Sequence, residues 1–133
     1  MILLDTHVLA WIAEGNPQTG LSARRLADDA LQKDELMVSA FSFWELAMLG
    51  AKGRLKGDWS TERLRRKSLE QGIREVAVSG EIGIAAVGLA GLPGDPADRI
   101  IVATAMSVDA TLLTADERLL RWRGKLRTVD ARR

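Results

Sequence analysis

The segment Met1-Ile2-Leu3-Leu4-Asp5-Thr6-His7, residues 1–7, contains the pattern that decides the fold. Four apolar residues form a short run, and Asp5 ends it. A short apolar run that stops at a polar residue is typical of a strand buried on both faces. An amphipathic segment continues to about residue 13, just before Gly15-Asn16-Pro17, and it predicts a helix. The chain therefore begins with a strand, an acid and a helix, in that order.

The same alternation of strand and helix recurs along the chain. Strands that alternate with helices usually form a parallel sheet covered on both faces. We therefore predict the α/β class, with a parallel β-sheet sandwiched between α-helices in a single domain, residues 1–133. The further strands are expected at residues 36–38, 73–78, 111–114 and 126–129, and the further helices at 22–33, 42–50, 60–71, 82–90, from 96 onward and at 116–122.

Composition excludes several classes of site. The chain has 133 residues, of which 47% are hydrophobic and 28% charged, as expected for one folded domain. It contains no cysteine, which excludes disulfides, thiolate zinc sites and a cysteine nucleophile. Its one histidine, His7, excludes a zinc site built from several histidines.

Nothing in the sequence predicts a membrane or secretion signal. Asp5 interrupts the first apolar run, no basic segment precedes it, and no apolar stretch approaches the roughly 20 residues that span a bilayer. We expect a cytoplasmic protein without a membrane partner. The formal net charge is only +1, but basic residues gather in two regions, 52–67 and 118–127. These regions are either solvated surfaces or a rim that binds phosphate.

Four acidic residues follow predicted strands or open predicted helices. Asp5 ends the first strand, Asp116 follows the strand at residues 111–114, and Glu45 lies in the first turn of the helix after residues 36–38. Asp98 lies in the first turn of the helix that Pro96 opens. Parallel sheets gather functional side chains at the carboxyl ends of their strands. We therefore expect these four carboxylates to meet in one pocket.

Helix capping is the alternative interpretation for each acid taken alone. Ser42 and Glu45 are spaced as a capping box, and so are Thr114 and Glu117, with Asp116 inside the first turn. Asp5 has the position of a cap before the first helix. Only the joint pattern of the four acids favours a common site.

Carboxylates brought together repel one another. Two like charges about 4 Å apart repel by roughly 4 kcal/mol at an effective dielectric constant of 20. Such a cluster must take up protons, spread apart or bind a cation. Oxygen ligands without histidine favour Mg²⁺, or Mn²⁺, over zinc. Such an ion activates water and polarises a phosphoryl oxygen, so the pattern predicts phosphodiester hydrolysis.

Four segments, residues 2–7, 42–46, 95–105 and 113–119, resemble the PIN-domain nucleases, and specifically the VapC-type ribonuclease toxins of bacterial toxin–antitoxin pairs. The resemblance extends from Met1 to about Val129. It implies a metal-dependent endoribonuclease that hydrolyses RNA phosphodiester bonds. It also implies a homodimer, and a cognate antitoxin whose tail occupies the groove beside the acids.

The resemblance assigns roles to individual residues. Asp5, Glu45 and Asp98 correspond to ligands of Mg²⁺ or Mn²⁺, and Asp116 to a fourth acid that often acts through a water molecule. Two threonines, Thr6 and Thr114, match positions that support the site by hydrogen bonds.

Several neighbouring residues keep more than one interpretation. Asp95 is assigned first to capping the helix at Pro96, with the water shell of the metal as the alternative. Arg99 either binds phosphate or pairs with a carboxylate. No catalytic role is assigned to His7. Among the tryptophans, Trp11 and Trp44 are expected in the core, and Trp59 is the candidate for contact with RNA or a partner.

Other functions compete with the nuclease. A receiver-like signalling module also has clustered acids, but it expects paired acids after the first strand. A dehalogenase-type phosphatase needs Asp-x-Asp there, and position 7 is His7. A catalytically silent PIN relative is the third alternative, and the presence of all four acids disfavours it.

Overall fold

The computed structural model describes residues 1–53, 60–92 and 94–133. Within them, five parallel strands form one sheet in the order β3-β2-β1-β4-β5. The predicted α/β class and parallel sheet are therefore confirmed. Trp59 and two of the basic residues before it, Arg54 and Lys56, lie outside the described residues. The strands are β1 Ile2–Leu4, β2 Leu36–Ser39, β3 Arg74–Val76, β4 Thr111–Thr114 and β5 Thr128–Asp130.

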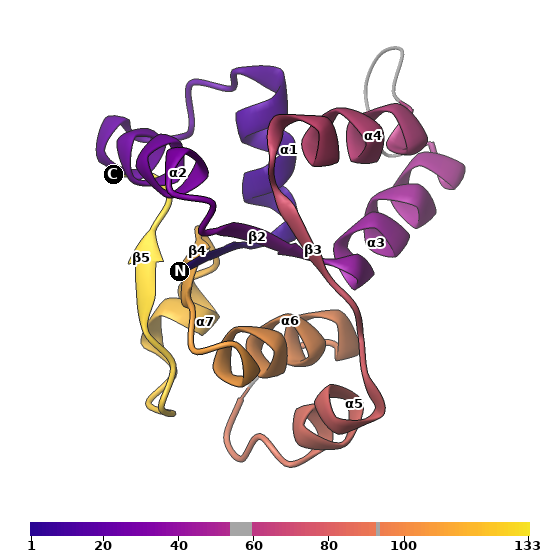
Figure 1. Cartoon of the computed structure of the whole chain (residues 1–133). Helices are drawn as coiled ribbons and strands as arrows, with labels where there is room; N and C mark the ends of the chain where they lie inside the picture. Colours follow the sequence, from indigo (N-terminus) through magenta and orange to yellow (C-terminus); the bar gives the residue numbers. More distant parts are fainter. Residues whose placement is uncertain (54–59, 93) are drawn as a thin grey trace.

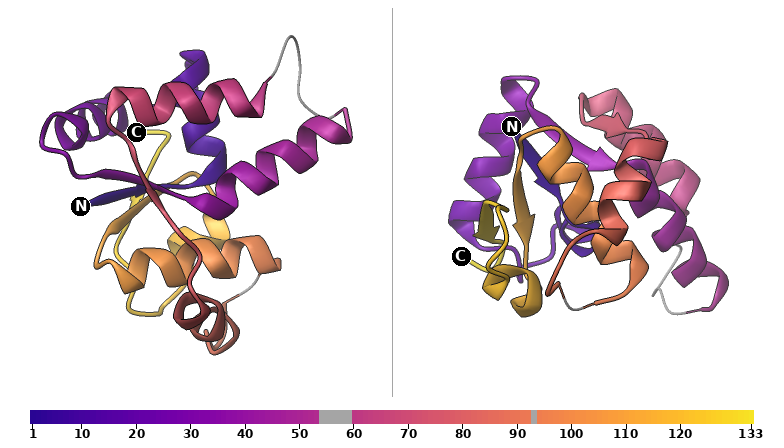
Figure 2. Two further views of the ribbon diagram at one scale, coloured as in Figure 1. Left: turned by 45° about the vertical axis from the view of Figure 1, so that its right-hand side comes forward. Right: turned by 90° about the horizontal axis from the view of Figure 1, so that it is seen from below.

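Helices cover both faces of the sheet. Figures 1 and 2 show α1, α2 and α4 on one side and α5 and α6 on the other. The three central strands read as short apolar runs because both of their faces are buried, whereas the edge strands β3 and β5 are polar and partly exposed. The helices are α1 Thr6–Glu14, α2 Leu21–Gln32, α3 Ala40–Ala51, α4 Thr61–Gln71, α5 Gly80–Val87, α6 Pro96–Ser107 and α7 Glu117–Arg121. None of the described helices is long and apolar enough to cross a membrane.

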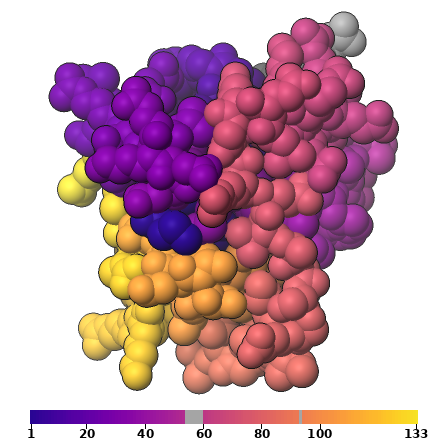
Figure 3. Space-filling view, viewed as in Figure 1, coloured from indigo at the N-terminus to yellow at the C-terminus, as the bar shows by residue number. Residues whose placement is uncertain are grey.

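Alternate residues of each strand enter different halves of the core, as the pleat of a strand requires. Leu4 packs with residues of α1, α2 and α3, whereas Leu3 packs with residues of α6 and α7. Helix α5 packs mainly on α6 through Ile82 and Ala86. In the space-filling view the start of the chain, in indigo, lies between later segments (Figure 3).

The central strand β1 is also the switch point of the sheet. From β1 the chain adds β2 and then β3 on one side, and later returns to add β4 and β5 on the other. In open parallel sheets, ligands bind at the carboxyl ends of the strands near such a switch point. The residues that follow β1, β2 and β4 therefore lie where a ligand site is expected.

Two predicted helix starts are wrong. Helix α2 has Gly20 as its N-cap, not Ser22, and Gly20 has no room for a side chain because a Cβ would lie 2.0 Å from the backbone carbon of Arg133. Helix α3 begins three residues early. Its N-cap is Ser39, the last residue of β2, which accepts a hydrogen bond from the Phe41 N–H at 3.1 Å. Strand and helix thus join without a loop.

Candidate active site

Asp5 is held between the two central strands. It is the N-cap of α1, where its Oδ1 accepts a hydrogen bond from the Thr6 N–H at 2.8 Å. Its Oδ2 accepts a hydrogen bond from the Thr114 hydroxyl, at the end of β4, at 2.6 Å. The side chain is buried, and this burial raises the pKa of Asp5 despite the two hydrogen bonds, which lower it.

Glu45 is not part of a capping box. Because Ser39 caps α3, Glu45 lies in the second turn of the helix rather than the first. Ser42 is buried and accepts a hydrogen bond from the Thr6 hydroxyl at 2.8 Å, so the predicted Ser42–Glu45 box is wrong. Burial raises the pKa of Glu45, a hydrogen bond from Thr6 lowers it, and the charge of Asp5 raises it further.

Asp98 lies beside several other acids at the start of α6. Asp95 is the N-cap of this helix, and its Oδ1 accepts a hydrogen bond from the Asp98 N–H at 3.1 Å, so the capping role predicted for Asp95 is confirmed. Burial, followed by the charges of Asp95, Asp5 and Asp116, raises the pKa of Asp98 to about 6. Gly94 leaves space for this carboxylate, because a Cβ there would lie 2.7 Å from Asp98 Oδ2.

Asp116 begins α7 as its N-cap, and its Oδ1 accepts a hydrogen bond from the Arg118 N–H at 2.9 Å. The predicted capping box of Thr114 and Glu117 is wrong. The Thr114 hydroxyl oxygen instead accepts a hydrogen bond from the N–H of Asp116, the residue just before the helix, at 3.1 Å. Hydrogen bonds from the Arg118 guanidinium are the main reason why the pKa of Asp116 is below its usual value.

The four predicted acids line one pocket of about 370 Å³ at the carboxyl end of the sheet. They reach it from four separate places: the ends of β1 and β4, the second turn of α3 and the first turn of α6. A pocket with converging carboxylates whose pKa values are raised is a candidate active site. Its lining residues are Asp5, His7, Trp11, Glu45, Asp95, Asp98, Ala115, Asp116, Arg118 and Arg132.

A family model described as the PIN domain matches residues 2–125. The chain belongs to the PIN domain family. The resemblance found in the sequence is therefore confirmed. Ribonuclease VapC22 of Mycobacterium tuberculosis is 34% identical to this PIN domain over 124 residues, which cover 89% of this chain and 88% of that protein.

Solved structures share the fold of this PIN domain. The crystal structure of VapBC2 from Rickettsia felis, bound to a DNA fragment from its promoter, matches with a TM-score of 0.69, 18% identity and coverage of 97% of this chain and 98% of the other. A toxin–antitoxin complex from Klebsiella pneumoniae matches with a TM-score of 0.65, 22% identity and coverage of 98% of both chains.

The carboxylates of this PIN domain suit a hard divalent cation by their chemistry. They are oxygen donors, and mutual charge contributes to the raised pKa values of Asp5, Glu45 and Asp98, so a cation would stabilise all three. As arranged in this structure, however, these carboxylates do not form a complete set of metal ligands. Within residues 1–53, 60–92 and 94–133, no three acidic or histidine side chains are grouped tightly enough to hold a metal ion as they stand.

Arg118 is a component of this pocket that the sequence did not reveal. Its Nη2 lies 2.8 Å from Asp116 Oδ2 and 3.2 Å from Asp98 Oδ2, and its Nε donates to Asp116 Oδ1 at 3.2 Å. In the sequence it was only one member of a basic region. Its position two residues after an acidic N-cap was the available signal, but the pairing with Asp98 depends on the tertiary structure.

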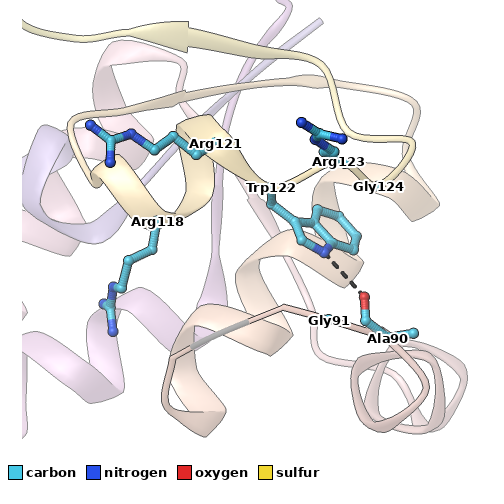
Figure 4. Close-up of a pocket in the computed structure, with 7 residues that line it drawn as sticks. All are labelled: Ala90, Gly91, Arg118, Arg121, Trp122, Arg123 and Gly124. Atoms are coloured by element: carbon cyan, nitrogen blue, oxygen red, sulfur yellow. Dashed lines mark hydrogen bonds between the residues drawn. The ribbon is translucent and has the colours of Figure 1, made fainter.

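Arg118 also lines a second pocket, of about 610 Å³, next to the acids. Figure 4 shows the Trp122 indole N–H directed at the backbone oxygen of Ala90, to which it donates a hydrogen bond at 3.2 Å. Exposed Arg123 lies beside this indole, whereas the exposed Arg121 side chain points away from it. The acidic pocket therefore has a strongly basic neighbour.

Arg99 and two tryptophans differ from their predictions. Among the residues that the structure describes, the guanidinium of Arg99 pairs with no carboxylate; it donates to the backbone oxygens of Ala86, Leu89 and Leu92, at 3.2, 3.1 and 3.0 Å. It thereby ties α6 to the preceding segment. Trp44 was expected in the core but is 55% exposed and stacks on Phe41. Trp11, also expected in the core, is half-buried and lines the acidic pocket.

Proposed function

We propose that this PIN domain is a metal-dependent endoribonuclease and the toxin of a type II toxin–antitoxin pair. The observation that carries the proposal is the meeting of Asp5, Glu45, Asp98 and Asp116 in one pocket. The 34% identity to a ribonuclease of the same family supports the choice of RNA as substrate. Family membership also favours a nuclease over a receiver-like module or a phosphatase.

In this proposal Asp5, Glu45 and Asp98 hold Mg²⁺ or Mn²⁺, and Asp116 supports them. The bound ion supplies charge neutralisation of the phosphodiester and activation of water. Thr114 positions Asp5, since its hydroxyl donates to Asp5 Oδ2. Thr6 links α1 to α3, since its hydroxyl donates to the Ser42 hydroxyl, and it lies close enough to Glu45 to lower the pKa of that carboxyl group. Holding carboxylates in place by hydrogen bonds reduces the rearrangement that binding of the ion would require.

The basic neighbour of the acids is the proposed place for the RNA backbone. Arg121 and Arg123 lie exposed beside Trp122, next to the acidic pocket. Exposed arginines attract a polyanion and hold its phosphates, whereas the carboxylates alone would repel it. One side of the site would thus bind the metal, and the other would bind the flanking phosphates.

The proposed partners are RNA, a cognate antitoxin and a second copy of this chain. The support for an antitoxin is that the solved structures with the same fold include toxin–antitoxin complexes. We propose a cytoplasmic location, where the RNA substrate is found.

Cleavage of structured RNA in Mg²⁺, Mn²⁺ or EDTA tests the function. We expect Asp5→Asn and Asp98→Asn to lower the cleavage rate about a hundredfold or more, since even residues behind a metal ligand commonly contribute 10- to 100-fold. Asp109→Asn is the matched control, because Asp109 is 88% exposed and pairs with Arg127. Undiminished cleavage by both pocket variants, or equal rates in EDTA and Mg²⁺, would refute the proposal.

A further inference from the structure

One guanidinium covers the solvent side of the acidic pocket. The Arg118 side chain is 53% exposed, whereas the Asp98 and Asp116 side chains that it contacts are only 14% and 23% exposed. Arg118 therefore approaches from the solvent and lies over carboxylates that are recessed beneath it.

Arg118 supplies the positive charge that the pocket has in this structure. Among the ion pairs of the described residues, those that reach the four predicted acids all come from Arg118. The other arginine in the lining, Arg132, is already paired with Asp130 and Glu117. The remaining carboxylates, Asp5 and Glu45, are held by hydroxyl and amide donors instead.

A divalent cation would need the same oxygens. Asp98 Oδ2 lies 3.2 Å from the guanidinium, so a metal ligand at this atom and an Arg118 ion pair place two cations on one oxygen. Like charges that close repel strongly. The side chain has another place to lie, because Arg118 also lines the pocket of Trp122 beside the acids.

We propose that Arg118 is an internal counterion of the acidic pocket, which competes with the divalent cation for Asp98 and Asp116 and is displaced when the cation binds. This inference rests on the metal site of the proposed function. It explains how the charges of Asp98 and Asp116 are balanced within the chain. It also predicts that Arg118 lowers the affinity for the ion.

Titration of the full chain with Mn²⁺, followed by calorimetry, tests the competition. We expect Arg118→Gln to bind Mn²⁺ about three- to tenfold more tightly than the unchanged protein, which is the order expected when a partly exposed ion pair no longer competes. Arg118→Lys keeps the positive charge and should stay within about twofold of the unchanged protein. An Arg118 that only ties α7 to α6 would leave the Mn²⁺ affinity unchanged or lower it.

Arg121→Gln is the matched control. Arg121 lies in the same helix, is 81% exposed and pairs with Glu117, so its replacement removes the same charge without removing a contact to the four predicted acids. Equal Mn²⁺ affinities of the Arg118→Gln and Arg121→Gln variants would overturn the inference. Thermal unfolding of each variant checks that it is folded.

The result also separates this inference from the proposed function. If the unchanged protein binds Mn²⁺ and cleaves RNA but Arg118→Gln binds no more tightly, the competition is refuted and the nuclease stands. If Arg118→Gln alone binds Mn²⁺, competition is supported. If no variant binds Mn²⁺, both the metal site and the competition fail.

Discussion

Two groups of acids meet near the start of α7, where Asp116 belongs to one and Glu117 to the other, and they are neutralised differently. In the acidic pocket, burial and neighbouring acids raise the pKa of Asp98 to about 6. In the C-terminal cluster, defined by Glu117, Asp130 and Arg132, the guanidinium lies 2.6 Å from Glu117 Oε1 and 2.8 Å from Asp130 Oδ2. Its hydrogen bonds lower the pKa of Asp130 to about 2.

The supply of cations, rather than the number of acids, distinguishes the proposed active site from a structural ion-pair cluster. The C-terminal cluster has an arginine fork positioned between its two acids, so its charges are satisfied within the chain. The pocket has more carboxylates than cations, and several are buried, so it is electrostatically incomplete. Incomplete charge of this kind is typical of sites that bind something.

The largest expected difference concerns catalysis. Glu45→Gln removes one carboxylate charge from the pocket and should lower the RNA cleavage rate about a hundredfold or more, as expected for a metal ligand. Glu117→Gln makes the same chemical change in the C-terminal cluster and should leave the rate within about twofold. Initial rates in Mg²⁺ measure both. Equal losses in the two variants would remove the functional distinction between the regions.

Metal addition should stabilise the protein through the pocket alone. A ligand at a free concentration of a hundred times its Kd stabilises a folded protein by about 2.7 kcal/mol. We expect Mn²⁺ to raise the Tm relative to EDTA in the unchanged protein and in Asp130→Asn, but far less in Asp98→Asn. A rise that persists in Asp98→Asn would place the ion elsewhere.

The two regions should respond to pH in opposite directions. The folded-state pKa of Asp98, about 6, exceeds its usual value of 3.8, so the folded state binds more protons between these values. The metal-free protein should therefore become more stable as the pH falls from 7 towards 4. Asp130 has a lowered pKa, about 2, and its contribution is lost only as the pH falls from about 4 towards 2.

Urea unfolding in EDTA at pH 7, 6 and 5 measures this dependence. Asp98→Asn should flatten the profile, and the residual slope should reflect Asp5 and Glu45, whose pKa values are also raised. Asp130→Asn should leave the profile in this range unchanged. Stability that falls between pH 7 and 5 in the unchanged protein would contradict the pKa direction assigned to the pocket.

The smallest effect is expected within the C-terminal cluster. Asp130→Asn weakens its ion pairs with Arg132, but partly exposed ion pairs contribute little to stability. We expect the Tm to fall by no more than about 2 °C, with RNA cleavage unchanged. A large loss of either would show that this cluster supports the site after all.

The sequence predicted the elements that depend on local pattern. Short apolar runs located the central strands β1, β2 and β4, and the acids after β1 and β4 were expected near one another because parallel strands end at a common edge. Helix starts were less certain, since Ser39 and Ser42 are equally good caps by type. Because β2 continues into α3 without a loop, Ser39 is the N-cap, and Glu45 takes no part in capping the helix.

Long side chains were predicted least well. Arg99 and Arg118 each follow an acid of the pocket closely in the sequence, yet one donates to backbone oxygens and the other bridges two carboxylates. An arginine side chain reaches far enough that its partner depends on how distant segments pack. That information is absent from local spacing, so Arg118 could not be distinguished from its basic neighbours.

The hydrogen bond between Asp5 and Thr114 joins residues 109 positions apart. At the usual 5–20 residues per second, a ribosome adds residue 116 about 6 to 22 s after residue 5. During that interval β1 lacks its β4 neighbour, and the acids have no shared pocket. Under the proposed function, an unfinished polypeptide could not cleave the messenger RNA from which it is being translated. Ribonuclease activity would begin only when synthesis has nearly ended.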